Sequence, residues 1–436
     1  MAGPDWRDGL PDQPDLPHPP YLPYAPKESL YASTDDFIVQ PARAGGRFDA
    51  PSGQGAARVD LTGKTVMPAL INAHGHLGYQ KEMTYLAENY TRENLIDHLN
   101  RYAYYGVAAM MTPGTDAGDL PYQLRDEPHP GALFRFAGRG LAAPNAGPGA
   151  QAMRAAPYGV TTEEEARKDV QELAARKVDF IKVWVDDRNG TVKKLTPALY
   201  KAIIDEAHKR NLRVVAHVFY LTDAQELVRS GVDGFLHLVR DAEMDDGLIK
   251  MMKEKKVFAT PNLAVSERAT HAERPAWLDD PLLAETVSAD VIKRLGGTFG
   301  NREAAALARS RDSYAAQQRS LAKLNAAGVT IALGDDTGVQ DNFYGYTEHR
   351  ELELMVAAGM TPAQVIVAAT RTAAELLRFN QLGTVAVGKS ADFIVLDANP
   401  LDNIANTRKI SKVYLRGQEL DRAAMRAAWE ASGKLR

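Results

Sequence analysis

The feature that most constrains this fold is a regular alternation between short apolar runs and longer amphipathic stretches, which begins at Thr65. Each apolar run is bounded by polar and turn-forming residues, which is typical of buried parallel strands rather than half-exposed antiparallel ones. Eight such runs occur, at residues 65–74, 107–115, 132–140, 178–187, 212–219, 232–238, 257–264 and 329–336. The pattern predicts eight strands that alternate with helices.

The stretches between and after these runs have the spacing of amphipathic helices. Among them, helices are predicted at residues 92–106, 161–177, 196–211, 347–360 and 361–379. Thr161 and Glu164 are predicted to form a capping box, and Thr196 with Pro197 gives an N-cap followed by proline. A Rossmann-type sheet would also alternate strands and helices, but no G-x-G-x-x-G motif follows an early strand. We therefore expect an α/β fold, a (β/α)8 TIM-like barrel.

The alternation divides the chain into three parts. Residues 1–55 are rich in Pro, Gly and Asp and are expected to form an irregular arm with partial accessory strands, with 35–42 and 56–61 as candidate segments. Residues 56–380 are expected to form the barrel. Residues 381–436 change to short strand patterns with glycine turns and an amphipathic tail, which predicts one segment of a small β-sandwich and a terminal helix.

Composition narrows the classes of partner. Fifty-two Lys and Arg against 56 Asp and Glu give a formal charge of −4, which argues against a nucleic-acid binder. The absence of cysteine excludes disulfides, thiolate zinc sites and cysteine nucleophiles. No apolar run approaches the roughly 20 residues needed to span a bilayer, and no signal peptide is recognisable at the N-terminus. We expect a cytoplasmic protein without a membrane partner; a periplasmic or secreted protein is the alternative. The protein could also form a homo-oligomer.

Polar residues interrupt the apolar runs near their carboxyl ends, where barrel enzymes carry their catalytic groups. They are His74, His76, Lys182, His217, His237, Asp335 and Asp336. Because parallel strands bring their carboxyl ends to one mouth, six of these positions are predicted to converge. His74 and His76 form a His-x-His pair whose side chains leave the same face of a strand, so both can reach one divalent ion. A pair of hydrogen-bonded core or surface histidines is the alternative.

Lys182 interrupts the run FIKVWV, where a buried ammonium without a partner would be costly. One interpretation buries the stem of this lysine and directs its amine to Asp186 or Asp187. The other is a neutral amine that captures carbon dioxide and becomes a carbamate. The two carbamate oxygens could bridge two cations about 3.5–4 Å apart. The residues alone favour neither interpretation.

His217 and His237 each stand alone in an apolar run, where a histidine is more often a hydrogen-bonded core residue than a ligand. Their position on adjacent strands, beside the His-x-His pair and a buried lysine, favours a metal site.

Asp335 and Asp336 alternate faces, so only one of them can face the mouth and bind a metal or accept a proton; an Asx turn is the alternative. Nitrogen and oxygen ligands suit Zn²⁺, with Mn²⁺ or Co²⁺ as alternatives. The remaining histidines are expected mainly at the surface.

This ordered set of His-x-His, Lys, His, His and Asp resembles the amidohydrolase superfamily, in particular its imidazolonepropionase-like and prolidase-like branch with a lysine on strand four. The similarity extends from about Val59 to Leu415. It is carried by GKTVMPALINAHGHL, DFIKVW, RVVAHVF, GVDGFLHL, TIALGDD, AGMTPAQVIVAATRTAAELL and GTVAVGKSADFIVLDANPL. The resemblance implies a distorted barrel with a binuclear metal centre, and a small β-sandwich built from segments that flank the barrel.

The resemblance also implies a ligand set. The more buried metal would be bound by His74, His76 and Asp336, and the second, bridged by the Lys182 carbamate, by His217 and His237. The family segment usually reads Gly-Thr-Asp or Gly-Ser-Asp, so Asp335 replaces a hydroxyl residue here. The N-terminus departs further, because only AARVDLTGKTVMP matches the expected strands. Either the sandwich is partial or residues 1–55 derive from an altered reading of the gene.

The expected activity is hydrolysis of a C–N bond in a small amide such as an N-acyl amino acid or a dipeptide. A hydroxide bridging two divalent metals, most of all Zn²⁺, would attack the carbonyl, while Asp336 accepts the proton and delivers it to the leaving amine.

Tyr79, Tyr220 and Arg240 follow the histidine strands and are candidate substrate contacts, with Arg240 suited to pair with a carboxylate. Each of the three could instead be structural. A same-fold enzyme of another class is the alternative function: a lactam or cyclic amidine hydrolase, a phosphotriester or lactone hydrolase, or a decarboxylase. The third alternative is a protein without catalytic activity that uses the barrel as a binding scaffold.

Overall fold

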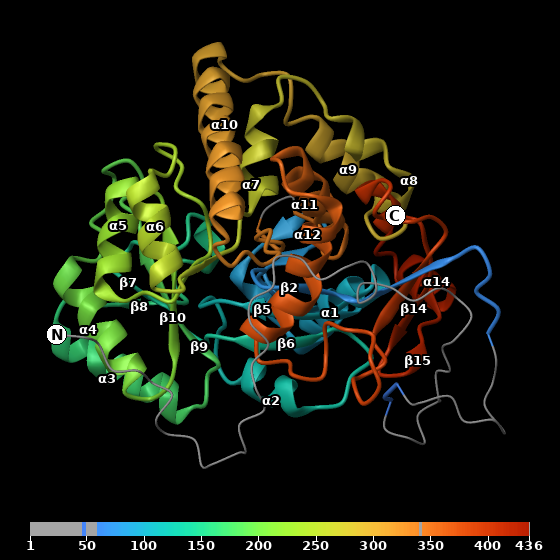
Figure 1. The fold of residues 1–436 in the computed structure, drawn as a ribbon, viewed down its shortest axis with the longest axis horizontal. Coiled ribbons are helices and arrows are strands. Elements are labelled where there is room, and N and C mark those ends of the chain that lie inside the picture. The colour runs from blue at the N-terminus through green and yellow to red at the C-terminus, as the bar shows by residue number, and fades with distance from the viewer. Residues whose placement is uncertain (1–45, 49–58, 340–341, 436) are drawn as a thin grey trace.

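The computed structural model describes residues 46–48, 59–339 and 342–435. The arm predicted over residues 1–55, including the strand predicted at 35–42, therefore lies outside the described residues apart from 46–48. Strands occupy the centre of the molecule, helices surround them, and a small antiparallel sheet lies at one side (Figure 1). This is the α/β architecture that the alternating pattern predicts.

Seven strands and one shorter segment run parallel around the centre. In chain order the strands are β2 (Leu70–Asn72), β5 (Val107–Thr112), β6 (Leu133–Phe136), β9 (Phe180–Val185), β10 (Arg213–Val218), β11 (Gly234–Phe235) and β12 (Phe258–Ala259). They fall into two sheets, β2-β5-β6 and one that contains β9 to β12, extended past β9 by β7 (Leu141–Ala142) and β8 (Tyr158–Gly159).

Backbone hydrogen bonds join these two sheets into a ring. On one side Asp179 N donates to Phe136 O at 2.9 Å. On the other side, Ile331 forms a parallel bridge with Ala259 of β12, and Ala73 N donates to Leu333 O at 2.8 Å. The eight segments therefore encircle one core, as in a (β/α)8 barrel.

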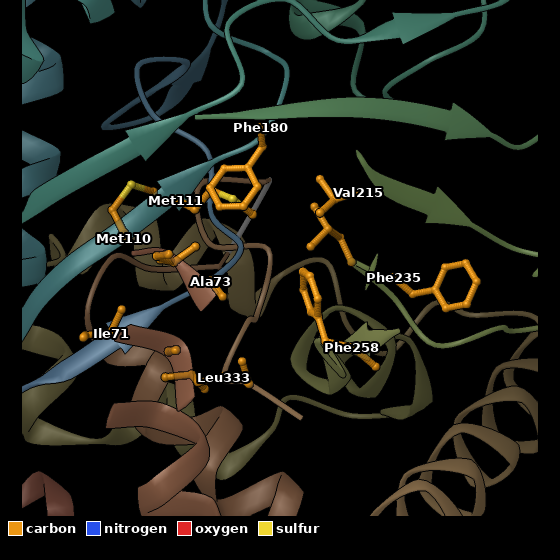
Figure 2. Packing of buried hydrophobic residues seen from close by; sticks show 14 of the residues in the cluster. Ile71, Ala73, Met110, Met111, Phe180, Val215, Phe235, Phe258 and Leu333 are labelled. Atoms are coloured by element: carbon orange, nitrogen blue, oxygen red, sulfur yellow. The ribbon is translucent and has the colours of Figure 1, made fainter. Parts of the chain in front are cut away.

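The core of this ring is made of apolar side chains. Ile71, Met110, Phe180, Val215 and Phe258 are buried in one cluster, although they come from both sheets (Figure 2). Successive residues of a strand face opposite sides, so each strand contributes both to this interior and to the layer beneath the helices. The apolar runs of the sequence are thus explained by burial on both faces.

Helices follow the strands as the periodicity predicts. Their bounds are α1 (Arg92–Tyr104), α2 (Leu120–Asp126), α3 (Glu163–Ala175), α4 (Pro197–His208), α5 (Leu221–Ser230), α6 (Asp246–Glu254), α7 (Leu263–Glu267), α8 (Pro281–Ala284), α9 (Ala289–Gly296), α10 (Ala304–Ala327), α11 (Tyr346–Ala357), α12 (Pro362–Val367), α13 (Ala373–Leu376) and α14 (Arg422–Ala431). The cap predicted at Thr196 is present. The capping box before α3 is formed by Thr162 and Glu165 rather than Thr161 and Glu164, because Thr162 is the residue that adopts the extended N-cap backbone.

The helix predicted over residues 361–379 is interrupted. Between α12 and α13 the chain forms a π-helical turn, Ala368–Thr372. The carbonyl of Ala368 accepts a hydrogen bond from Leu333 N at 3.1 Å. The turn therefore supplies a backbone acceptor to the eighth barrel segment.

The first apolar run is divided between two sheets, which corrects the prediction of one strand over residues 65–74. β1 (Thr65–Pro68) pairs antiparallel with β13 (Phe393–Leu396), whereas β2 belongs to the barrel. The break falls at Ala69, whose N–H donates to Asp392 O at 3.0 Å. A continuous apolar run cannot reveal this division, because both halves are buried.

The last three barrel segments are also shorter than their apolar runs. β11 and β12 have two residues each, and the run 329–336 contributes an isolated bridge rather than a strand. Asn262 and Asp336 have left-handed backbones, with φ of 51° and 60°. A residue in this conformation cannot continue a strand, so the chain turns at these positions to form the mouth of the barrel.

The accessory part is a four-stranded antiparallel sheet in the order β1-β13-β14-β15, completed by β14 (Ile410–Leu415) and β15 (Gln418–Glu419). Phe48, Val66, Phe393 and Tyr414 form its own small core. Within the described residues this is the only sheet of the predicted sandwich. Residues 56–61 were a candidate strand, but 59–61 are not in a strand and 56–58 lie outside the described residues.

Two of the remaining histidines, His98 and His349, are buried; a surface position was expected for most of this group, with His349 as a candidate pocket residue. His98 is 3% exposed and its Nε2 lies 2.8 Å from Gln80 O. His349 is fully buried, with Nε2 2.9 Å from Tyr105 O. Each imidazole therefore satisfies a backbone carbonyl, a structural use that residue position alone does not reveal. Across the described residues, no helix combines the length and apolar character needed to cross a bilayer.

Replacing Asp97 by alanine is expected to lower the free energy of unfolding by about 3 kcal/mol. Asp97 lies in α1 and anchors the C-terminal helix, since it binds Trp429 Nε1 at 2.9 Å, Lys434 Nζ at 2.6 Å and Arg101 Nε at 2.8 Å. Alanine would leave these donors without their buried acceptor. Urea unfolding at pH 7 measures the loss, and the exposed Asp119→Asn variant, which alters only a surface pair, should change stability little.

The same contacts predict the pH range over which Asp97 stabilises the fold. Burial alone would raise the pKa of Asp97, but Arg101 and Lys434 hold it at about 2, below the usual 3.8. The stabilisation is therefore complete above pH 3.8 and is lost as the pH falls towards 2. An Asp97→Ala protein with wild-type stability at pH 7 would show that these contacts do not hold the helix.

Candidate metal centre at the barrel mouth

The His-x-His pair lies where the chain leaves β2. The N–H of His74 donates to Asn72 Oδ1 at 2.9 Å, which fixes the backbone at this end of the strand. A Cβ at position 75 would collide with the Tyr102 hydroxyl, so Gly75 permits close packing of helix α1 behind the pair. His74 and His76 are 1% and 4% exposed and their ring centroids lie 5.4 Å apart. The predicted pairing of these two side chains is therefore present.

Asp336 completes a compact group with the two histidines. Its Oδ1 lies 3.2 Å from His74 Nε2 and 3.0 Å from His76 Nε2. Its backbone is placed by a hydrogen bond from Asp336 N to His74 O at 2.9 Å, and its φ is 60°. Such a backbone in a non-glycine residue is uncommon and is kept when the surrounding structure fixes it. Strands one and eight therefore bring His74, His76 and Asp336 together.

Asp335 faces the other way, as the alternation of side chains predicts. Its Oδ1 accepts hydrogen bonds from Asn72 Nδ2 at 2.7 Å and Thr337 N at 3.0 Å. The side chains of Asn72 and Thr337 also donate to Glu348 Oε1, so the two buried carboxyl groups are neighbours. Burial raises the pKa of Asp335 to about 7 and that of Glu348 well above its ordinary value. The pair therefore keeps a proton up to near-neutral pH and supports the mouth from behind.

Lys182 lies in the middle of β9 and is 1% exposed. Its amine is 4.9 Å from the centre of the Trp184 ring, and among the described residues no carboxylate lies within 4.0 Å of it. Asp186 and Asp187, the alternative partners, bind His217 Nε2 at 3.0 Å and the Tyr220 hydroxyl at 2.7 Å instead. Burial lowers the pKa of Lys182 to about 7. The amine is thus buried, poorly compensated and largely neutral above that pH.

His217 and His237 stand beside the first group. Their ring centroids are 4.6 Å apart, and His237 lies 4.9 Å from His74. The Nε2 of His237 faces Asp336 Oδ2 at 3.9 Å. Burial lowers the pKa of His217 to about 4 and that of His237 well below 6.5. Both imidazoles are therefore neutral near pH 7, which is the form that can bind a metal.

The three predicted substrate contacts differ in position. The Tyr79 hydroxyl donates to Thr115 O at 2.5 Å, and its ring packs beside Tyr90. The Tyr220 hydroxyl is held by Asp187. Arg240 lies within the histidine group, with Nη2 2.7 Å from His237 Nδ1. Of the three, Arg240 is in direct contact with a predicted ligand.

Two residues at the mouth were not predicted from the sequence. Asn262 Nδ2 lies 2.5 Å from His74 Nδ1 and 3.1 Å from His237 Nδ1. Thr115 Oγ1 lies 2.7 Å from His76 Nδ1. Both follow barrel strands at the carboxyl end, so the rule that found the histidines could also have found them. Partners of this kind orient imidazole ligands and select the nitrogen that faces a metal.

His74, His76 and Asp336 fit a divalent cation. One ligand atom from each of His74, His76 and Asp336 can be chosen so that all three lie within 4.8 Å of one another. Asp336 Oδ1 is buried and, among the described residues, lacks a hydrogen bond of normal geometry, although two imidazole nitrogens face it. Burial lowers the pKa of His74 well below 6.5, so this ligand is neutral. Two imidazoles and a carboxylate are typical of zinc and related divalent ions.

Comparison with known proteins identifies relatives of this chain. A sequence model of the amidohydrolase family matches residues 65–420. A 5-methylthioadenosine/S-adenosylhomocysteine deaminase of Halalkalibacterium halodurans is 24% identical over 375 residues, which are 78% of this chain and 74% of that protein. Ochratoxinase of Aspergillus niger is 28% identical over 255 residues, 55% of this chain and 45% of that enzyme.

Solved structures superpose on most of this chain. A Bifidobacterium longum protein provisionally described as a prolidase superposes with a TM-score of 0.66 and 27% identity, covering 89% of this chain and 92% of that one. Molinate hydrolase superposes with a TM-score of 0.65 over 87% and 89% of the two chains, and at 21% identity it supports the fold. With the match over residues 65–420, these findings show that the chain belongs to the amidohydrolase family and is a hydrolase acting on carbon–nitrogen bonds.

Proposed function

We propose that this protein is a metal-dependent amidohydrolase that cleaves the amide bond of a small substrate with a free carboxylate, such as an N-acyl amino acid or a dipeptide. The observation that carries the proposal is the convergence of His74, His76 and Asp336 beside a buried lysine that has no carboxylate within 4.0 Å in the described part of the chain. Lys182, His217 and His237 extend this group across the mouth. A chain that used the barrel only as a scaffold would have no physical reason to bury these polar side chains together.

The first metal would be held by His74, His76 and Asp336. A second would be held by His217 and His237, with Lys182 as its carbamate between the two ions. Zn²⁺ suits this set of nitrogen and oxygen ligands, and carbon dioxide is the second cofactor implied. Bound divalent cations would lower the pKa of water and polarise the carbonyl of the substrate.

Asp336 is the residue proposed to move the proton. Burial raises the pKa of Asp336, but His74, His76 and Lys182 together lower it below 3.8, so this carboxylate is ionised at neutral pH. It can accept the proton of the attacking water and pass it to the nitrogen of the leaving amine. Without this transfer the amine would leave as a strongly basic anion.

Arg240 is the residue proposed to bind the substrate carboxylate. It lies at the carboxyl side of β11 beside His237, and among the described residues no carboxylate lies within 4.0 Å of its guanidinium. A guanidinium can bind a carboxylate through two parallel hydrogen bonds. The similarity to a protein described as a prolidase supports a substrate of this kind.

The direct test is a screen of N-acyl amino acids and dipeptides with protein reconstituted with zinc and bicarbonate. Release of free amine is the expected result. Release of carbon dioxide or phosphate from the corresponding substrates, with no amine from any amide, would favour another enzyme class of the same fold. Protein that binds no zinc after reconstitution would contradict the metal-dependent reaction altogether.

Replacing Arg240 by alanine is expected to raise KM for carboxylate-bearing amides by about 10- to 100-fold, because a charge-assisted bidentate contact is lost. KM for neutral esters or amides of the same acyl group should change much less. Steady-state kinetics on a matched pair of substrates, one with a free carboxylate and one methyl ester, measures the difference. Arg229→Ala, which removes an exposed arginine from α5, is the control. Equal losses on both substrates would contradict the carboxylate contact.

A further inference from the structure

The partners of the imidazoles determine which ring nitrogen can bind a cation. His217 Nε2 lies 3.0 Å from Asp186 Oδ2, and the other oxygen of Asp186 accepts Arg188 N at 2.8 Å. An ionised carboxylate can only accept hydrogen bonds, so Nε2 of His217 carries the proton. Its Nδ1 then has a free lone pair. Asp186 therefore holds His217 in a form that is ready to bind a metal.

His237 has the opposite arrangement. Arg240 Nη2 lies 2.7 Å from His237 Nδ1, and a guanidinium can only donate. The lone pair of Nδ1 is thus engaged, and the proton of the neutral ring is on Nε2, the atom that faces Asp336 Oδ2. Neither nitrogen of His237 has a lone pair available while Arg240 is in this position.

The other partners of the imidazoles leave the direct restriction on His237 to Arg240. Thr115 contacts His76, and a hydroxyl can donate or accept. Asn262 Nδ2 donates to Leu236 O as well as facing His74 and His237, so its amide is held as a donor; its two N–H groups serve the nearer acceptors, Leu236 O and His74 Nδ1, rather than His237 at 3.1 Å. Arg240 makes the shorter contact with His237, and a guanidinium has no acceptor in any orientation. His237 can therefore become a ligand only if the guanidinium moves away from Nδ1.

The contacts of Arg240 indicate which kind of ligand its positive charge could bind. Its Nε is buried and has no hydrogen-bond partner among the described residues, and the two carboxylates whose charges act on it, Asp336 and Asp186, form no ion pair with it within 4.0 Å. A buried guanidinium that has a free donor and no ion pair in direct contact can bind an anion. Under the proposed function that anion is the carboxylate of the substrate.

Resting on this proposed function, we infer that Arg240 couples the two binding events at the mouth. Its guanidinium either caps Nδ1 of His237 or binds the substrate carboxylate. Release of His237 permits the second metal to bind, and capture of a carboxylate keeps the guanidinium away from the imidazole. Each ligand therefore strengthens the binding of the other by the same factor. Arg240 is a positioning residue for the second metal as well as a contact for the substrate.

Zinc titration of the metal-free protein tests this coupling without any turnover. Isothermal calorimetry and chelator competition would compare the wild type with Arg240→Met, which keeps the bulk but removes the donors. Arg188→Met is the matched control, since it removes a nearby positive charge whose side chain binds the carbonyls of Asn145 and Gly147. The second zinc is expected to bind at least about tenfold more tightly to Arg240→Met, with the first zinc unchanged. Arg188→Met should show no such gain.

A carboxylate provides the second arm, which needs only the wild-type protein. Propionate is expected to tighten the second zinc by about fivefold or more, whereas the neutral propionamide has no effect. In Arg240→Met the propionate effect should disappear. Cobalt in place of zinc would report the ligation of the second ion through its visible absorption.

Three results would overturn the inference: equal affinity for the second zinc in the wild type and Arg240→Met, an equal gain in Arg188→Met, or a propionate effect that persists in Arg240→Met. The last would mean that propionate binds the metal directly. Failure of the proposed function is distinguishable, because a protein that hydrolyses no amide can still show the coupling in these titrations. If the protein hydrolyses amides but the second zinc and the carboxylate bind independently, the proposed function stands and this role of Arg240 is wrong.

Discussion

Replacement of Asp336 by asparagine is expected to reduce turnover by about 10²- to 10⁴-fold, the range in which a positioned acid or base contributes to catalysis. Asparagine has nearly the same shape, and its carbonyl oxygen can still face the imidazoles of His74 and His76. It cannot accept a proton from water or return one to the leaving amine. The loss should therefore appear in kcat, while KM changes less.

Metal content must be measured in the same preparation, because Asp336 is also a proposed ligand. Elemental analysis after reconstitution at saturating zinc separates the two roles. A protein with full zinc content and strongly reduced kcat supports proton transfer by Asp336. Wild-type turnover with zinc bound would exclude Asp336 as the proton acceptor, and loss of both zinc and activity would assign it to metal binding.

Replacement of Lys182 by methionine is expected to remove one of two equivalents of bound zinc and to lower kcat/KM by on the order of 10²- to 10³-fold, comparable to the loss of one electrostatic contact in an active site. Methionine fills most of the buried space of the lysine stem, so the fold should be retained. It cannot form a carbamate. Lys168→Met, on the exposed side of α3, is the control for the substitution itself.

Bicarbonate distinguishes a carbamate from an ordinary lysine contact. Wild-type protein stripped of metal in carbon dioxide-free buffer should regain both zinc and activity only when bicarbonate is supplied, and Lys182→Met should not respond. Because burial lowers the pKa of Lys182 to about 7, the reactive neutral amine increases as the pH rises through 7. Reactivation should therefore become faster between about pH 6 and 8. Full reactivation without bicarbonate would reject the carbamate.

Much of the architecture could be predicted from the sequence, because burial on both faces leaves a direct pattern. The runs at 107–115, 178–187 and 212–219 became β5, β9 and β10 with small changes at their ends. The runs at 232–238 and 257–264 gave only two-residue strands. In the second of these runs Asn262 has a left-handed backbone that cannot continue a strand, and hydrophobicity does not report backbone handedness.

The candidate site could be predicted for a different reason. Parallel strands end at one edge of a barrel, so polar residues such as His76, Lys182 and His237 are brought together by register alone. Their hydrogen-bond partners could not be predicted in the same way. Asn262 lies 188 residues from His74 in the chain, and its contact with Nδ1 depends on how two loops pack.

The sequence by itself determined which side chains gather at the mouth, since strand order and the alternation of faces are encoded in local patterns. Only the tertiary structure decided how each group is used: Asp336 faces the histidines while Asp335 pairs with Glu348, and Asp186 accepts from His217 while Arg240 donates to His237. The physical reason is that a hydrogen bond depends on distance and direction between groups from separate segments. Such relations are fixed only when the segments pack.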